Sequence, residues 1–169
     1  MHLNPPLTRV WARRGEPARV PSAGIDQKAV ILAGWNFATD AFHWMLAAGK
    51  NSDVFIQFLR QMVEERPSER KAKLVMDNAP YHRSNKTAGF LEDHSGQLEP
   101  FWLPSYSPEL NLIERVWHYL KEKVINNYFF GTLDRLTQAV RRACRELSST
   151  ADKILDIDFR TEKYFCPAA

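Results

Sequence analysis

Two carboxylates in the sequence have the neighbours that metal-dependent chemistry needs. Asp77 directly follows KLVM (residues 73–76), a short apolar segment typical of a β-strand, and α/β sheets bind ligands at the carboxyl ends of their strands. Glu114 lies in SPELNLIERVWHYLK, at the border of an apolar stripe typical of an amphipathic helix. A strand-end carboxylate and a carboxylate in the first turn of a neighbouring helix can converge on one site. Mg²⁺ takes oxygen ligands and keeps several waters, so few carboxylates are needed, and two ions about 3.5–4 Å apart stabilise both the attacking and the leaving oxygen of a phosphoryl displacement.

The same residues also have structural interpretations. Asp77 is a typical turn aspartate that hydrogen-bonds the backbone, and Asn111 three residues before Glu114 matches a capping box. His82, in DNAPYHRS, is either a ligand or base, or a structural residue at a strand-to-helix junction. Trp102, in FWLPSYSP, either belongs to the core or stacks on a base. Taken alone, these local patterns favour the structural interpretation.

The elements that must position these residues are predicted from hydrophobic periodicity. Strands are expected over 28–37 and 40–48, joined by a polar turn at Thr39–Asp40, and again over 73–76 and 97–103. A helix is expected from Ser52, as N-cap, to Glu65, and a polar helix over 84–93. Two further helices follow from apolar residues at helical spacing, namely Ile113, Val116, Trp117, Leu120 and Val124, then Leu133, Leu136, Val140 and Leu147. Strands paired first as a hairpin and then alternating with helices predict an α/β domain with a mixed sheet.

Composition excludes several classes of protein. The chain has 169 residues, 44% of them hydrophobic and 25% charged, which predicts one globular domain. Its apolar runs are far shorter than the ~18 residues that span a bilayer, so no membrane association is expected. The segment MHLNPPLTRVWARRG lacks the apolar stretch of a signal peptide. Two cysteines, Cys144 and Cys166, cannot form a disulfide framework, so a reducing cytoplasmic setting is predicted.

Positive charge is concentrated in two segments, although the net charge is only +3. Four arginines and one acidic residue, Glu16, lie in the first 25 residues, and residues 115–145 carry seven basic side chains against two acidic ones. Such segments either contact a phosphate backbone or form a solvated helix face.

A family resemblance distinguishes these alternatives. VMDNAPYHRS followed by FWLPSYSPELNLIERVWHYLK resembles the second and third catalytic blocks of the DDE transposases, in the bacterial insertion-sequence branch of the mariner-like superfamily. The upstream text HLNPPLTRVWARRGEPARVPSAGIDQKAVILAGWN is similar to that branch as well. The resemblance implies a ribonuclease-H-like fold, shared with retroviral integrases. It also implies DNA transposition, in which carboxylates hold two Mg²⁺ or Mn²⁺ ions while water, and later a DNA 3′-hydroxyl, attacks a phosphodiester.

Carried over by position, the resemblance makes Asp77 the second acidic metal ligand and Glu114 the third, 37 residues further on. Asn78, His82 and Asn111 match neighbouring positions of the same motifs and would support the site. The implied partners are DNA and either a second copy or a full-length transposase, in the bacterial cytoplasm at the nucleoid. The candidate phosphate contacts are Arg13, Arg14, Lys121 and Lys123.

The sequence departs from the family at its beginning. The family's first catalytic Asp precedes the block that here reads HLNPPLTRVW, whereas this chain starts at Met1 and has Glu16 as its first acidic residue. We therefore expect a catalytic domain over 1–150 truncated at its N-terminus, with the first strand largely missing, followed by a tail over 151–169. Little or no strand cleavage by this chain alone is expected. The alternatives are a non-catalytic remnant that binds DNA or pairs with a full-length transposase, and a cellular nuclease of the same fold.

Overall fold

The computed structural model describes residues 1–155, with gaps at positions 4, 5, 10, 18, 22, 23, 25, 26, 37, 38, 40, 66–70, 106, 108 and 109, and describes side chains up to residue 148. Every strand and helix predicted from periodicity is present. The elements are β1 (Val30–Asn36), β2 (Ala41–Ala47), α1 (Ser52–Glu64), β3 (Ala72–Met76), α2 (Asn85–Asp93), β4 (Leu98–Trp102), α3 (Ile113–Leu120) and α4 (Leu133–Leu155). A π-helical turn, Lys121–Ile125, continues α3.

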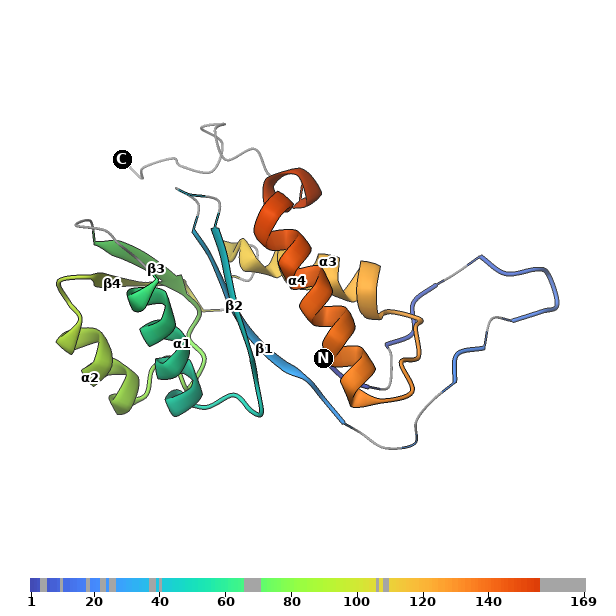
Figure 1. Ribbon diagram of the computed structural model, residues 1–169, viewed down its shortest axis with the longest axis horizontal. Coiled ribbons are helices and arrows are strands. Elements are labelled where there is room, and N and C mark those ends of the chain that lie inside the picture. Colours follow the sequence, from blue (N-terminus) through green and yellow to red (C-terminus); the bar gives the residue numbers. More distant parts are fainter. Residues whose placement is uncertain are drawn as a thin grey trace.

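The four strands form two separate ladders in the described part of the chain. β1 and β2 are antiparallel, and β3 and β4 are parallel (Figure 1). Strand directions are therefore mixed, as predicted, but the two pairs are not hydrogen-bonded into one sheet. The parallel register places Met76 opposite Trp102, so the segments that begin at Asp77 and Leu103 leave the same end of the β3–β4 ladder.

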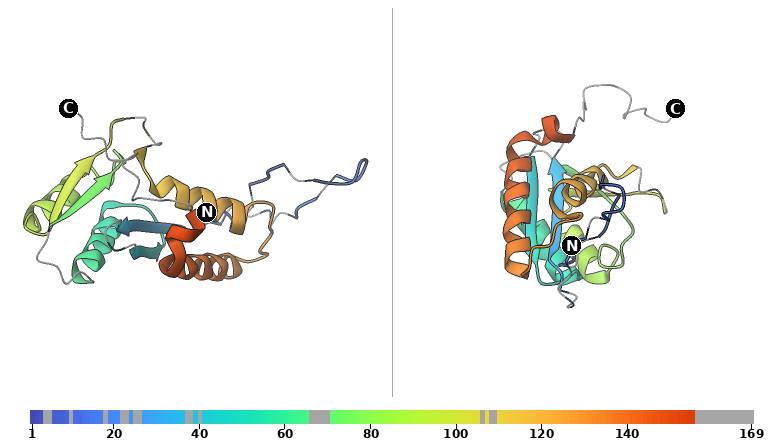
Figure 2. Two further views of the ribbon diagram at one scale, coloured as in Figure 1. Left: turned by 90° about the horizontal axis from the view of Figure 1, so that it is seen from above. Right: turned by 90° about the vertical axis from the view of Figure 1, so that its right-hand side faces the viewer.

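The β1–β2 hairpin lies between two hydrophobic cores because its side chains alternate between its two faces. Trp35 and Phe42 belong to a core formed mainly by α3, the π-helical turn and α4, whereas Leu32 belongs to a core formed by α1, β3, α2 and β4. The ribbon views show these two groups of elements on either side of the hairpin (Figure 1 and Figure 2). The most buried residues of the first core include Val116, Leu120, Leu136, Val140 and Leu147. The hairpin thus connects the half of the molecule that carries Asp77 with the half that carries Glu114.

Two predicted helix caps are wrong by one residue. The N-cap of α1 is Asn51, whose side chain accepts a hydrogen bond from the Val54 N–H at 2.9 Å, and Ser52 is the first helical residue. The N-cap of α3 is Leu112, with no side-chain capping bond, so the predicted capping box does not form. Asn111 instead accepts the Glu114 N–H through its backbone carbonyl at 2.9 Å. The Glu114 carboxylate is therefore not committed to closing its own helix.

The C-terminal helix runs past the expected end of the domain. α4 continues to Leu155, beyond position 150, and residues 156–169 of the predicted tail lie outside the described residues, as does Asp40 of the predicted turn. None of the described helices is both long enough and apolar enough to cross a membrane.

The Cys144 thiol is expected to be inert in the folded chain. Its side chain is completely buried, and burial raises its pKa to about 11. Because only the thiolate reacts, ionisation alone slows its reaction with a disulfide reagent at pH 8 by about 100-fold relative to an unperturbed thiol. Titrating a Cys166→Ser variant with Ellman's reagent, before and after adding guanidinium, measures this difference. Rapid labelling of the folded variant would contradict the buried position of Cys144.

Candidate metal and nucleic-acid site

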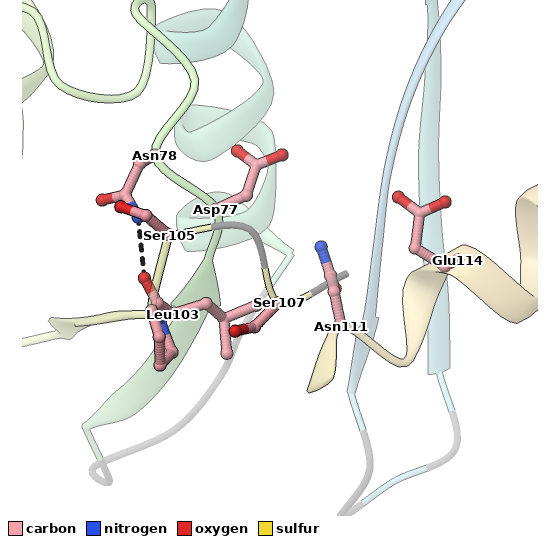
Figure 3. Close-up of a pocket in the computed structure, with 8 residues that line it drawn as sticks. Asp77, Asn78, Leu103, Ser105, Ser107, Asn111 and Glu114 are labelled. Atoms are coloured by element: carbon pink, nitrogen blue, oxygen red, sulfur yellow. Dashed lines mark hydrogen bonds between the residues drawn. The ribbon is translucent and has the colours of Figure 1, made fainter. Parts of the chain in front are cut away.

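One pocket of about 420 Å³ opens where the segments after β3 and β4 meet the start of α3. Figure 3 shows the residues that line it, which are Asp77, Asn78, Leu103, Pro104, Ser105, Ser107, Asn111 and Glu114. The structure therefore brings together the two carboxylates proposed as ligands, and it adds Asn78 and Asn111 from the same motifs. Ser105 and Ser107 also line the pocket and were not predicted to.

Asp77 is oriented through one of its two carboxylate oxygens. Oδ1 accepts a hydrogen bond from the Ala79 N–H at 3.1 Å and lies 2.7 Å from Nδ1 of His82. Within the described residues Oδ2 has no hydrogen-bond partner, and 54% of the side chain is exposed. Asp77 is thus both the turn aspartate of the structural interpretation and a carboxylate with an oxygen available to a ligand.

His82 contacts Asp77 and does not itself line the pocket. Its side chain is only 13% exposed, and its ring centroid lies 4.3 Å from those of both Phe55 and Tyr81. An imidazole held in this way, with its proton on Nδ1, donates to Asp77 Oδ1 and fixes the carboxylate. Burial, together with the negative charge of Asp77, raises the pKa of Tyr81, so the tyrosine remains neutral beside the site.

Asn78 connects the two segments that form one wall of the pocket. Its Nδ2 donates to the Leu103 carbonyl at 2.7 Å, and its Oδ1 accepts from Nε and Nη2 of Arg83 at 3.0 and 2.6 Å. The Arg83 guanidinium also lies over the Trp102 ring, 3.8 Å from its centroid. Trp102 therefore neither lies fully in the core nor is open to a base on the face that Arg83 covers.

Glu114 reaches the pocket because α3 is fixed on its opposite face. Val116 and Leu120 of this helix are fully buried, whereas Glu114 is exposed. In Figure 3 the carboxylates of Asp77 and Glu114 point the same way from the two sides of the pocket, with the Asn111 amide between them. The residues that line the pocket are thus mainly ones whose side chains carry oxygen atoms.

The four predicted DNA-contacting side chains lie away from the pocket. Arg13 and Arg14 are exposed on the basic arm (residues 11–17, blue in Figure 1), at the end of the molecule opposite β3 and β4. Lys121 and Lys123 are exposed on the π-helical turn. The base of the arm is held close to this turn, since Asn127 accepts the Thr8 N–H at 2.9 Å.

The donors present suit a hard divalent cation. The pocket offers two carboxylates, two amides and two hydroxyls, and oxygen ligands of this kind, completed by water, are those of Mg²⁺ and Mn²⁺. No cluster of three or more His, Cys, Asp or Glu side chains with the geometry of a metal site occurs among the described residues. The pocket as described therefore supplies two carboxylates, not three.

Comparison with solved structures shows which fold this is. The Mos1 transposase paired-end complex with left transposon end superposes with a TM-score of 0.61 over 90% of this chain and 51% of that chain, at 17% identity. The Mos1 mariner paired-end complex with Mn gives a TM-score of 0.60 over the same shares, at 16% identity. The mixed α/β, ribonuclease-H-like fold predicted from the sequence is thereby confirmed.

Sequence comparison identifies the family. The uncharacterised 39 kDa protein of insertion element IS630 from Shigella sonnei is 26% identical over 148 residues, which cover 88% of this chain and 43% of that protein. The uncharacterised protein y4pE/y4sA of Sinorhizobium fredii is 29% identical over 89 residues, covering 53% and 62% respectively. The chain thus spans only part of the length of the curated relatives it matches. A family model described as DDE superfamily endonuclease matches residues 1–137. By this match, which includes both carboxylates of the pocket, the chain belongs to the DDE superfamily endonucleases.

Proposed function

We propose that this chain is the catalytic domain of a transposase, which moves DNA by metal-dependent phosphodiester hydrolysis and strand transfer. The single observation that carries the proposal is that Asp77 and Glu114, from separate elements, line one pocket rich in oxygen donors. Membership of the DDE superfamily supports it, and so does the similarity to a protein of an insertion element.

Asp77 and Glu114 would hold Mg²⁺ or Mn²⁺, with two ions bound in the complete site. The available Oδ2 of Asp77 and the exposed Glu114 carboxylate supply charge, while Asn111 and Ser107 supply neutral oxygens. When bound, such ions activate water and stabilise the oxygens that attack and leave phosphorus. His82 keeps Asp77 in place during this chemistry, and Asn78 keeps the two strand ends together.

This chain alone is expected to cleave DNA very weakly or not at all. The pocket supplies two carboxylates, which are too few to neutralise and hold two divalent ions. In such a pair one carboxylate normally bridges both ions, and each ion needs a further ligand of its own. The test is Mg²⁺-dependent nicking of a duplex that ends in the transposon's terminal repeat. Strong nicking that disappears in Asp77→Ala would contradict weak activity while supporting the metal site, and Glu99→Gln, on the exposed face of β4, is the matched control.

A second candidate is a non-catalytic chain that binds DNA or pairs with a full-length transposase. The observation that favours it is the combination of a two-carboxylate pocket with an exposed basic arm. Adding this chain to an active full-length relative distinguishes the candidates, because a pairing remnant reduces transposition in proportion to its concentration. Unchanged transposition would contradict a chain that pairs with the full-length transposase.

The basic arm is expected to contribute charge to DNA binding without sequence preference. Exchanging both Arg13 and Arg14 for Gln should make the dependence of DNA affinity on salt weaker. The negative slope of log K for DNA binding against log salt concentration should decrease in magnitude by about 1.8, since each phosphate contact contributes about 0.9. Fluorescence anisotropy with a labelled duplex, measured from low to physiological salt, gives this slope. An unchanged slope would exclude both arginines as phosphate contacts.

A further inference from the structure

We propose that Arg83 is a preset phosphate-binding residue beside the pocket, holding a phosphate of the DNA strand next to the phosphate that reacts. The inference rests on the proposed function, because it assigns the DNA strand to this pocket. It goes beyond that function by naming a contact that depends on neither carboxylate.

The Arg83 guanidinium is fixed on two sides before any ligand arrives. Its Cζ lies over the Trp102 ring at 3.8 Å from the ring centroid, a cation–π contact. Asn78 Oδ1 accepts from its Nε and Nη2, which sets the rotation of the plane. The backbone is fixed as well, since the Arg83 N–H donates to the Ala79 carbonyl at 3.2 Å. A long side chain ordered in this way has already lost the rotamer freedom that binding would otherwise cost.

The remaining donors of Arg83 have the geometry that an anion needs. A guanidinium has five N–H groups, and Asn78 uses one on Nε and one on Nη2. Both N–H groups of Nη1 and the second of Nη2 have no partner within the described residues, and together they form the fork that binds phosphate oxygens in pairs. Two exposed cations, Lys86 and Arg142, lie in ion pairs, with Asp53 at 2.8 Å and Glu146 at 3.1 Å. Among the described ion pairs Arg83 has no carboxylate partner, so its charge is available to an external anion.

Asn78 also places this charge next to the reactive site. It lines the pocket, directly follows Asp77 and holds the guanidinium, whereas Arg83 itself does not line the pocket. An anion on Arg83 therefore lies beside the pocket and not inside it. A phosphodiester neighbouring the one attacked is the ligand that fits both positions, because a DNA strand carries a phosphate at every nucleotide.

Arg83→Gln, measured by anisotropy with a labelled duplex in Ca²⁺ or EDTA, tests the proposal without any cleavage. We expect the affinity for the duplex to fall about tenfold. The slope of log K against log salt concentration should decrease in magnitude by about 0.9, the contribution of one phosphate contact. Arg83→Lys keeps the charge but loses the fork and the stacked plane, so it should restore the slope and only part of the affinity. Arg60→Gln is the matched control, because Arg60 also lies over an aromatic ring, 6.0 Å from the Phe90 centroid, yet does not contact the pocket wall.

The outcomes separate this inference from the proposed function. A salt slope in Arg83→Gln equal to that of the wild type, with an unchanged melting temperature, overturns the Arg83 assignment alone. An equally large decrease of the salt slope in Arg60→Gln also overturns it, because the decrease would then reflect only the lower net charge of the chain. Failure of the proposed metal site is detected by a separate measurement, the affinity for Mn²⁺. That affinity would then be unchanged when Asp77 or Glu114 is substituted. A wild-type chain that binds no duplex at any salt concentration would overturn both proposals.

Discussion

Exchanging Asp77 for Asn or Glu114 for Gln is expected to reduce the affinity of the chain for Mn²⁺ by about 100-fold. Each substitution keeps the size of the side chain and removes one of the two negative charges of the pocket. Loss of a mere outer-shell partner costs about 10–100-fold in metal affinity, so loss of a ligand should reach the upper end of that range. Titration of free Mn²⁺ by electron paramagnetic resonance measures the affinity directly and does not require cleavage.

The double variant gives the sharper result. If both carboxylates hold the same ion, the second substitution should cost far less than the first, because the ion has already lost its site. Two independent surface carboxylates would instead give additive losses. Glu99→Gln should leave the affinity unchanged, since Glu99 is exposed on β4 and does not line the pocket. Additive losses, or equal affinity in all variants, would show that Asp77 and Glu114 do not share a cation.

A further variant tests the orienting role of His82. His82→Phe should keep the ring packing against Phe55 and Tyr81 but leave Asp77 Oδ1 with only the Ala79 N–H. We expect a loss of about 10-fold in Mn²⁺ affinity, the range typical of an outer-shell partner. An unchanged affinity in a variant with an unchanged melting temperature would make His82 a packing residue only.

The spacing of hydrophobic residues along the sequence was sufficient to predict the strands and helices, because burial on defined faces determines where they form. The continuous apolar run over 28–37 predicts a strand buried on both faces, and Leu32 and Trp35 of β1 do lie in the two different cores. The helix starts were less predictable. Asn51 and Ser52 are both good caps, and which of them is used depends on the chain direction entering α1. At α3 the N-cap is Leu112, one residue after Asn111, so a sequence that fits a capping box has no capping geometry.

The candidate site was only partly predictable for a different reason. Four of the pocket residues belong to continuous sequence motifs, namely Asp77, Asn78, Asn111 and Glu114. The contact of Arg83 with Trp102 has no local signal, because it exists only through the parallel register that sets Met76 opposite Trp102. The same register brings Ser105 and Ser107 to the pocket. Side chains that meet through strand pairing between distant segments cannot be found from spacing along the chain.

Leu136→Ala is expected to lower the free energy of unfolding by about 2–5 kcal/mol. Leu136, on α4, is completely buried in the core that also holds Val116 and Leu120 of α3, so its truncation leaves a cavity under the helix that carries Glu114. Urea unfolding followed by tryptophan fluorescence measures the change. The midpoint should fall while the slope with urea stays the same, since the surface exposed on unfolding is unchanged.

The matched control is Leu7→Ala, which removes the same atoms from a side chain that is 72% exposed and should change stability by no more than about 0.5 kcal/mol. Leu59→Ala makes the same truncation in the other core, where Leu59 is 2% exposed. Because the β1–β2 hairpin belongs to both cores, we expect the two core variants to unfold in a single transition each. A second transition in either variant would mean that the halves carrying Asp77 and Glu114 fold independently. Their carboxylates would then be held together by the hairpin alone, and metal binding should weaken in Leu136→Ala well before the chain unfolds.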